Sequence, residues 1–238
     1  MRWQNVLLDF DGVVAINTQE VAFGVFVESF AAFGVELTID EMFERYLGWR
    51  GEQILENVSQ VHGVSVDPDI LKPVRQTIHH RLLRDVRKDS SLDRLLQQTV
   101  ATYICSANSA GSIENLLRVL QIHDHFPAGT VFGQRTDCRN KPHPDIYLTC
   151  LRARSLDAVR TCAVEDSLVG VRAARAAGLE VYGMVGGIPA HLRDRYSDQL
   201  LEAGARQVIS DFGDVIGSAE PLLTGQSAAR CSDGRDHR

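Results

Sequence analysis

The sequence predicts an α/β protein: a Rossmann-like, doubly wound parallel sheet with an all-helical domain inserted after the first strand. Short, almost entirely apolar segments alternate with helical patterns, which is typical of parallel strands covered on both faces. Between Val14 and about Arg87, amphipathic helical periodicity continues without any strand-like alternation. Polar residues follow the strand ends, where open parallel sheets bind their ligands.

Five strands are expected, and polar or glycine residues follow each of them. They cover Asn5–Asp9, Val100–Cys105, Thr161–Val164, Glu180–Val185 and Gln207–Ile209. The insertion is expected to hold four helices separated by glycines, at Glu20–Phe33, Ile39–Leu47, Glu52–His62 and Pro68–Leu83. These elements assign residues 1–15 and 88–217 to the α/β core and 16–87 to the helical insertion. Residues 218–238, rich in Ser, Gly, Ala and charge, are expected to form a disordered tail.

Composition narrows the class of protein. The chain has 238 residues, 44% hydrophobic and 24% charged, so it can bury a core without disulfides. A net charge of −6 without a basic run argues weakly against nucleic-acid binding. No apolar run approaches the roughly 18 residues of a membrane span, and the first one is broken by Asp9. Five unpatterned cysteines favour reduced thiols, so we expect a cytoplasmic protein. We also expect a monomer or a homodimer.

The first candidate site is Asp9-Phe10-Asp11-Gly12, directly after a buried strand. Side chains alternate along a strand, so Asp9 and Asp11 should face one way while Phe10 packs behind them. Two carboxylates at one sheet edge repel each other unless a proton or a cation lies between them. Gly12 permits a tight exit from the strand. The alternative is a strand-to-loop corner with two solvated acids.

A second acidic pair, Glu165-Asp166, ends the third predicted strand and should reach the same edge. Several oxygen ligands at one point suit Mg²⁺ better than zinc, which prefers nitrogen and sulfur. Alternatively, Asp166 or Ser167 merely caps the following helix.

Two further polar residues complete the candidate set. Ser106 is the first polar residue after the second strand, and Lys141 lies in a proline-stiffened segment. Their ordinary roles would be a helix N-cap for Ser106 and a solvated surface charge for Lys141. Beside a phosphate, Lys141 would be a fixed positive charge.

In this order, Asp9-Phe-Asp-Gly12, Ser106, Lys141-Pro142 and Glu165-Asp166 resemble the four motifs of the haloacid dehalogenase superfamily. The segments Lys141–Tyr147 and Glu165–Arg172 are similar to the subgroup of β-phosphoglucomutases and sugar-phosphate phosphatases. Helices inserted after the first motif match that subgroup's cap.

The resemblance implies a role for each motif. Asp9 would be the nucleophile that forms an aspartyl-phosphate, and Asp11 the general acid and base. Mg²⁺ would be held by Asp9, the Asp11 carbonyl and Asp166, with Glu165 acting directly or through water. The phosphoryl oxygens would be bound by three groups: Ser106, Lys141 and the backbone N–H of Ala107.

The resemblance also implies where the substrate is selected. Closure of the cap over the site would exclude water. Candidate substrate contacts are Asn108 on the core and Trp49 and Arg50 in the cap loop. In β-phosphoglucomutases the equivalent arginine directly precedes an acid, whereas here Gly51 stands between Arg50 and Glu52.

The function expected is hydrolysis of a small phosphorylated metabolite, such as a sugar phosphate. Dehalogenases lack an acid at the position of Asp11, so its presence favours phosphoryl transfer. Imine-forming relatives use a cap lysine, and the setting of Lys72 does not suggest that role. A sugar phosphomutase and a non-catalytic phosphate-binding module remain alternatives.

Overall fold

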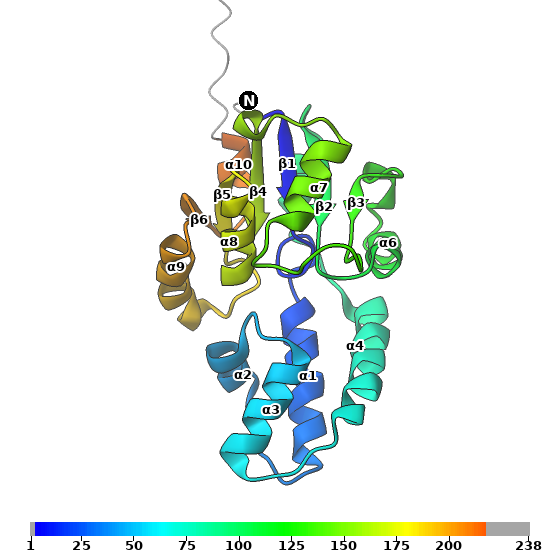
Figure 1. Ribbon diagram of the computed structural model, residues 1–238, viewed down its shortest axis with the longest axis vertical. Helices are drawn as coiled ribbons and strands as arrows, with labels where there is room; N and C mark the ends of the chain where they lie inside the picture. The colour runs from blue at the N-terminus through cyan, green and yellow to red at the C-terminus, as the bar shows by residue number, and fades with distance from the viewer. Residues whose placement is uncertain (1–2, 218–238) are drawn as a thin grey trace, which may run out of the picture.

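The computed structural model describes residues 3–217, and the tail expected at 218–238 lies outside this range. A sheet with helices on both faces forms one body. Four helices form a second body beyond the carboxyl ends of the strands (Figure 1). Within residues 3–217, no helix is both long enough and apolar enough to cross a membrane.

Six parallel strands form the sheet. They are β1 (Asn5–Leu8), β2 (Ala101–Cys105), β3 (Val131–Phe132), β4 (Thr161–Glu165), β5 (Glu180–Met184) and β6 (Gln207–Ile209). The five predicted strands are confirmed to within one residue at each end. Strand β3 was not predicted, because two partly exposed residues carry no recognisable alternation. It forms the edge of the sheet by pairing with β2.

The strand order β3-β2-β1-β4-β5-β6 places the first strand in the middle of the sheet. The chain moves outward from β1 to β3 and then returns to the other side of β1 with β4. This reversal leaves a crevice outside the carboxyl ends of β1 and β4. The first and last acidic motifs follow these two strands, so the topology alone brings them together.

The two faces of the sheet bury alternate residues of each strand. Leu7 packs on one face beneath the first group of helices, α7 (Asp145–Ala153), α8 (Leu168–Ala176) and α9 (Arg193–Glu202). Val6 and Leu8 pack on the other beneath α5 (Leu92–Leu96), α6 (Ala110–Val119) and α10 (Gly213–Gly217). Cys105 and Cys162 are fully buried among these residues. Short 3₁₀ turns lie at His123–His125, Ala158–Arg160 and Ala190–Leu192.

The insertion contains the four predicted helices: α1 (Thr18–Ala31), α2 (Ile39–Tyr46), α3 (Gly51–His62) and α4 (Leu71–Asp85). Helix α2 begins with a reciprocal capping box between Thr38 and Glu41. Helix α3 ends at Gly63, whose φ of 65° is left-handed. The fourth helix begins three residues later than predicted, because a 3₁₀ turn capped by Asp67 occupies Pro68–Ile70.

The chain passes between the sheet and the helical insertion twice, and the Asn17 side chain forms hydrogen bonds that link these two segments. Its Oδ1 accepts a hydrogen bond from the Arg87 N–H at 2.7 Å, and its Nδ2 donates to the Asp85 carbonyl at 2.9 Å. The Ile16 N–H also donates to the Arg87 carbonyl at 2.9 Å. These contacts hold the helices over the carboxyl edge of the sheet. Domain boundaries at 15/16 and 87/88 stay a prediction.

Candidate active site

Asp9 leaves β1 at the middle of the sheet edge. Its N–H donates to the Val164 carbonyl at 2.9 Å, and its side chain is almost entirely buried. Phe10 is fully buried behind it, as the strand alternation predicted. The chain then turns at Gly12, where φ is 72° and a Cβ would lie 2.0 Å from Asp166 Oδ2. Only glycine satisfies both constraints, so Gly12 allows Asp166 to approach the turn.

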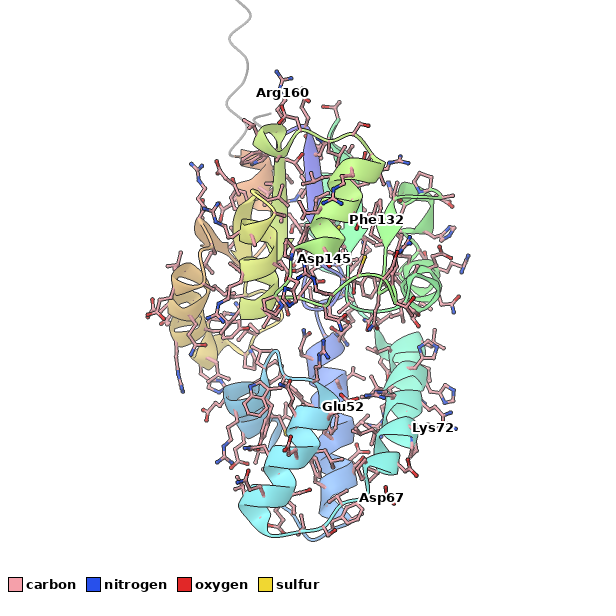
Figure 2. The ribbon with its side chains drawn as sticks, in the orientation of Figure 1. Glu52, Asp67, Lys72, Phe132, Asp145 and Arg160 are labelled. Atoms are coloured by element: carbon pink, nitrogen blue, oxygen red, sulfur yellow. The ribbon has the colours of Figure 1, made fainter. Side chains whose placement is uncertain are left out.

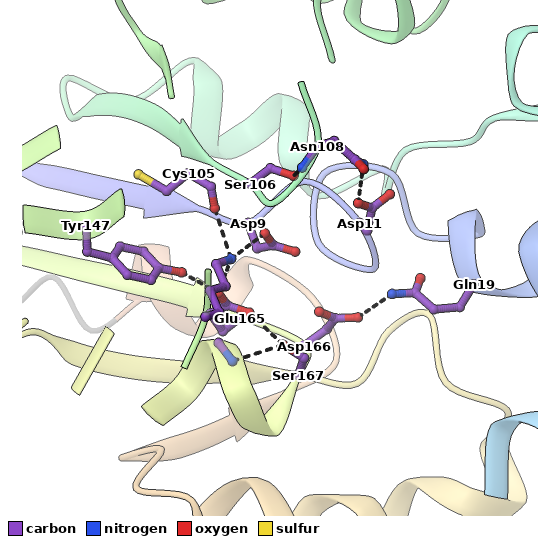
Figure 3. A network of polar contacts seen from close by, with 12 residues as sticks. Asp9, Asp11, Gln19, Cys105, Ser106, Asn108, Tyr147, Glu165, Asp166 and Ser167 are labelled. Atoms are coloured by element: carbon purple, nitrogen blue, oxygen red, sulfur yellow. Dashed lines mark hydrogen bonds and ion pairs between the residues drawn. The ribbon is translucent and has the colours of Figure 1, made fainter. Parts of the chain in front are cut away.

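The Lys141 side chain is only 8% exposed, so its interpretation as a solvated surface charge is wrong. Its ammonium donates to Asp9 Oδ1 at 2.7 Å, to Glu165 Oε1 at 2.5 Å and to the Cys105 carbonyl at 3.0 Å (Figure 3). An ammonium has three N–H groups, and all three are used. Burial alone would lower the pKa of Lys141, but the charges of Asp9 and Glu165 raise it overall. Lys141 therefore stays cationic and neutralises part of the acidic site.

Glu165 is fully buried at the end of β4. Its Oε1 accepts hydrogen bonds from both Lys141 and the Tyr147 hydroxyl. Burial, followed by the charge of Asp9, raises the pKa of Glu165 to about 7, although Lys141 lowers it. The carboxylate lies directly on the first turn of α8, where a Cβ at Gly170 would be 2.0 Å from Oε2.

Asp9, Glu165 and Asp166 can each place one carboxylate oxygen within 4.8 Å of the others. Burial, and then the charges of Asp9 and Glu165, raise the pKa of Asp166 far above its usual range. Among residues 3–217, the only ion-pair partner of these three acids is Lys141. Three buried hard-oxygen donors with excess negative charge fit a divalent cation.

Asp11 is not a member of this group of three acids. Its Oδ2 accepts a hydrogen bond from Asn108 Nδ2 at 2.6 Å. Burial and the charge of Asp9 raise the pKa of Asp11 to about 7, while hydrogen bonds from Thr18 and Asn108 lower it. The group can therefore exchange a proton near neutral pH. The predicted metal contact of Asp11 through its carbonyl stays a prediction.

The loop after β2 carries the other predicted phosphate ligands. Ser106 is fully buried, and its Oγ accepts the Asn108 N–H at 3.1 Å. It does not cap α6, because Ser109 does so by accepting the Ser112 N–H. Ala107 is exposed and lines the large cleft described below. Ser106, Ala107 and Lys141 also line a small adjoining hollow.

Ser167 has the capping role that the alternative interpretation gave it. Its Oγ accepts the Gly170 N–H at 3.1 Å and so begins α8. Asp166 does not cap this helix. Instead, its Oδ2 accepts a hydrogen bond from Gln19 Nε2 at 2.8 Å. Gln19 lies in the first turn of α1, so the helical insertion reaches the acidic group directly.

A cleft of about 1290 Å³ separates the acidic edge from the helical insertion. Asp9, Asp11 and Asp166 line one wall. Trp49 and Arg50 line the opposite wall, and Trp49 is 45% exposed. The structure thus places all the predicted site residues around this cleft or directly behind its acidic wall.

Several cleft residues were not predicted. His79 lines the cleft from α4 together with Arg75. Positions 75, 78, 79 and 82 all line it, which is the spacing of one helical face, but this spacing alone does not show what the face borders. Figure 2 shows Lys72 elsewhere on α4, and it does not line the cleft. This position agrees with excluding Lys72 as a catalytic lysine.

Similar proteins identify the family. Residues 6–184 match the family described as haloacid dehalogenase-like hydrolase. The chain is 30% identical to the protein CbbY of Cereibacter sphaeroides over 221 residues, 84% of this chain and 92% of the relative. It is 25% identical to a phosphorylated carbohydrates phosphatase of Thermotoga maritima over 209 residues, 84% and 91% of the two chains.

A solved structure agrees with these similarities. A haloacid dehalogenase-like protein of Agrobacterium tumefaciens superposes with a TM-score of 0.81 and 28% identity, covering 91% of this chain and 97% of the other. The relatives also include a beta-phosphoglucomutase. The chain therefore belongs to the haloacid dehalogenase-like hydrolases, near the β-phosphoglucomutases, CbbY proteins and sugar-phosphate phosphatases.

Proposed function

We propose that the protein is a Mg²⁺-dependent phosphatase that hydrolyses a small phosphorylated metabolite, most simply a sugar phosphate. The observation that carries this proposal is the position of Asp9. Its carboxylate lies at the base of a large cleft, paired with a buried lysine and next to two further acids. Membership of a family with phosphatase relatives supports the same reaction.

In the first half-reaction, a carboxylate oxygen of Asp9 attacks phosphorus and the bond from phosphorus to the ester oxygen breaks. Asp11 donates its proton to the departing alkoxide. In the second half-reaction, Asp11 accepts a proton from a water molecule that attacks the aspartyl-phosphate, which releases inorganic phosphate and restores Asp9. A pKa of about 7 for Asp11 suits a group that must work in both protonation states.

The surrounding residues bind and orient the phosphoryl group. Lys141 supplies a fixed positive charge, and we assign further donors to Ser106 and the N–H of Ala107. Asp9, Asp166 and the Asp11 carbonyl would hold Mg²⁺, with Glu165 behind them. When bound, Mg²⁺ would reduce the repulsion between the anionic nucleophile and the anionic phosphate.

Phosphate release from a panel of phosphorylated sugars and polyols, with and without Mg²⁺, tests the proposal. Asp9→Asn should lower turnover by about 10³-fold or more, because the amide is a poor nucleophile. Asp124→Asn, a fully exposed aspartate, is the matched control and should behave as wild type. Isomerisation of a sugar phosphate with little phosphate release would indicate a mutase. No Mg²⁺-dependent turnover of any ester would indicate a binding module. Cytoplasmic location remains a prediction.

A further inference from the structure

Tyr147 contacts the candidate active site from the core of the protein. It lies in α7, its side chain is fully buried, and its hydroxyl donates to Glu165 Oε1. The same oxygen accepts a hydrogen bond from Lys141, which also holds Asp9. We infer that Tyr147 is a positioning residue for phosphoryl transfer: its hydroxyl fixes the Glu165 carboxylate so that Glu165 holds Lys141 on Asp9. This inference rests on the proposed function.

The Glu165 carboxylate has few other restraints on its orientation. Its Oε2 lies 3.4 Å from Ser167 Oγ, a long contact from a side chain that already caps α8. Gly170 leaves room for the carboxylate but offers it no side chain. The Tyr147 hydroxyl is therefore the closer of the two neutral donors to this carboxylate, and it restrains the rotation of the carboxylate more strongly than Ser167 does.

The position of Glu165 matters because Lys141 is shared. The Lys141 ammonium donates hydrogen bonds to Asp9 Oδ1, Glu165 Oε1 and the Cys105 carbonyl. If Glu165 lost its second donor, its oxygen would interact more strongly with Lys141 and compete with Asp9. The ammonium would then be displaced from the nucleophile and from the phosphoryl group. Such a displacement should reduce kcat more than it changes KM.

The hydroxyl and the ring of Tyr147 make separate contacts, so a variant can remove one and keep the other. Its ring centroid lies 5.3 Å from Lys141 Nζ, and its ring packs with other apolar residues of the core. Tyr147→Phe keeps this ring and removes only the hydroxyl. Tyr182→Phe is the matched control, because Tyr182 is also buried and its hydroxyl accepts a hydrogen bond from Trp3 on the other face of the sheet.

The experiment measures kcat, KM and thermal stability for wild type, Tyr147→Phe, Glu165→Gln, the double variant and Tyr182→Phe. We expect Tyr147→Phe to lower kcat about tenfold with KM within about twofold. The double variant should be no slower than Glu165→Gln alone, because Tyr147 acts through Glu165. Tyr182→Phe should keep the wild-type kcat.

Some outcomes would overturn this inference without affecting the proposed function. These are an active wild type with an unimpaired Tyr147→Phe, losses that multiply in the double variant, or the same loss in Tyr182→Phe. If Tyr147→Phe does not fold, Gly170→Ala provides the second test, because its Cβ displaces the same carboxylate. A folded Gly170→Ala with wild-type kcat would also refute the inference. A wild type that releases no phosphate would instead refute the proposed function and the inference with it.

Discussion

The two walls of the cleft are built in opposite ways. On the sheet side, Asp9, Glu165 and Asp166 are buried and Lys141 joins two of them. On the helical side, Trp49 is 45% exposed and Arg50 is also exposed. The first wall is fixed by hydrogen bonds from at least four elements of the fold. The second presents exposed side chains from a loop between two helices.

This difference separates two tasks. Transfer of a phosphoryl group requires charges held in fixed positions in a site of low dielectric constant. Selection of a substrate requires side chains that remain available for a ligand, and these contribute little to folding. We therefore expect variants of the sheet wall to change both stability and turnover, whereas variants of the helical wall should change substrate affinity alone.

The largest effect is expected for Lys141→Met. Two buried carboxylates, Asp9 and Glu165, lose their counter-ion, which should cost about 3–5 kcal/mol of stability. Turnover should fall by at least about 10³-fold, because the nucleophile and the phosphate lose the same cation. Denaturant unfolding and phosphate-release assays measure the two losses. Lys88→Met, whose partner Asp93 is about half exposed, is the control and should lose less than about 1 kcal/mol.

Metal removal should produce the next largest effect, and it should depend on pH. Asp11 and Glu165 have folded-state pKa values of about 7, and that of Asp166 is also raised, so all three lie above the ordinary values near 4. Raised carboxyl pKa values favour folding at low pH, and this contribution is lost as pH rises towards 7. The chelated protein should therefore melt at a lower temperature at pH 8 than at pH 5. Scanning calorimetry with EDTA measures this change.

Added Mg²⁺ should reverse that loss, and more strongly at pH 8 than at pH 5, because protons compete with the cation for the same oxygens. Asp166→Asn removes one of these charges. It should raise the melting temperature of the chelated protein at pH 8 and abolish the response to Mg²⁺. An equal response to Mg²⁺ in wild type and Asp166→Asn would contradict the assignment of Asp166 to the metal site.

A smaller effect on the same wall is expected for Asn108→Ala. The Asn108 amide donates to Asp11 and lowers its pKa, so its removal should raise that pKa. Because Asp11 must be protonated to act as an acid, the alkaline limb of kcat/KM should move to higher pH. Asn115→Ala, on the exposed face of α6, is the control. If the alkaline limb of kcat/KM lies at the wild-type pH in both variants, then the ionisation of Asp11 does not determine that limb.

The sheet wall was largely predictable from sequence. Asp9 and Ser106 each follow an apolar strand and Glu165 ends another, and parallel strands bring their carboxyl ends to one edge. Lys141 carried no such signal, since it lies in a loop, and only its motif indicated the site. The role of Tyr147 could not be inferred, because a tyrosine in an amphipathic helix looks like an ordinary core residue until its hydroxyl has a visible partner.

The helical wall was less predictable. The four helices follow from periodicity and glycine positions, yet which of their faces borders the cleft depends on how the insertion is held over the sheet. Asn17 contributes to that placement through contacts with residues 68 and 70 positions away. Nothing local in the sequence reports such contacts. His79 and Arg75 were missed for this reason, although both lie on the helical face that lines the cleft.

The smallest effect on folding is expected for Arg50→Ala and Trp49→Ala. The Arg50 side chain is exposed in the cleft, so Arg50→Ala should stay within about 0.5 kcal/mol of wild-type stability. Trp49→Ala also loses an edge-to-face contact with Tyr46 and should stay within about 1.5 kcal/mol. If the two side chains contact the substrate beyond its phosphate, KM should rise about three- to tenfold on the best substrate while kcat stays near wild type. Arg45→Ala, exposed on α2 and not part of the cleft, should leave KM unchanged.

If KM is also unchanged in the Trp49 and Arg50 variants, then other residues of this wall select the substrate. Arg75 and His79 on α4 would be the next residues to test. A fall in kcat of about tenfold or more in either variant would show that the helical wall takes part in catalysis, and the two walls would then not have separate tasks.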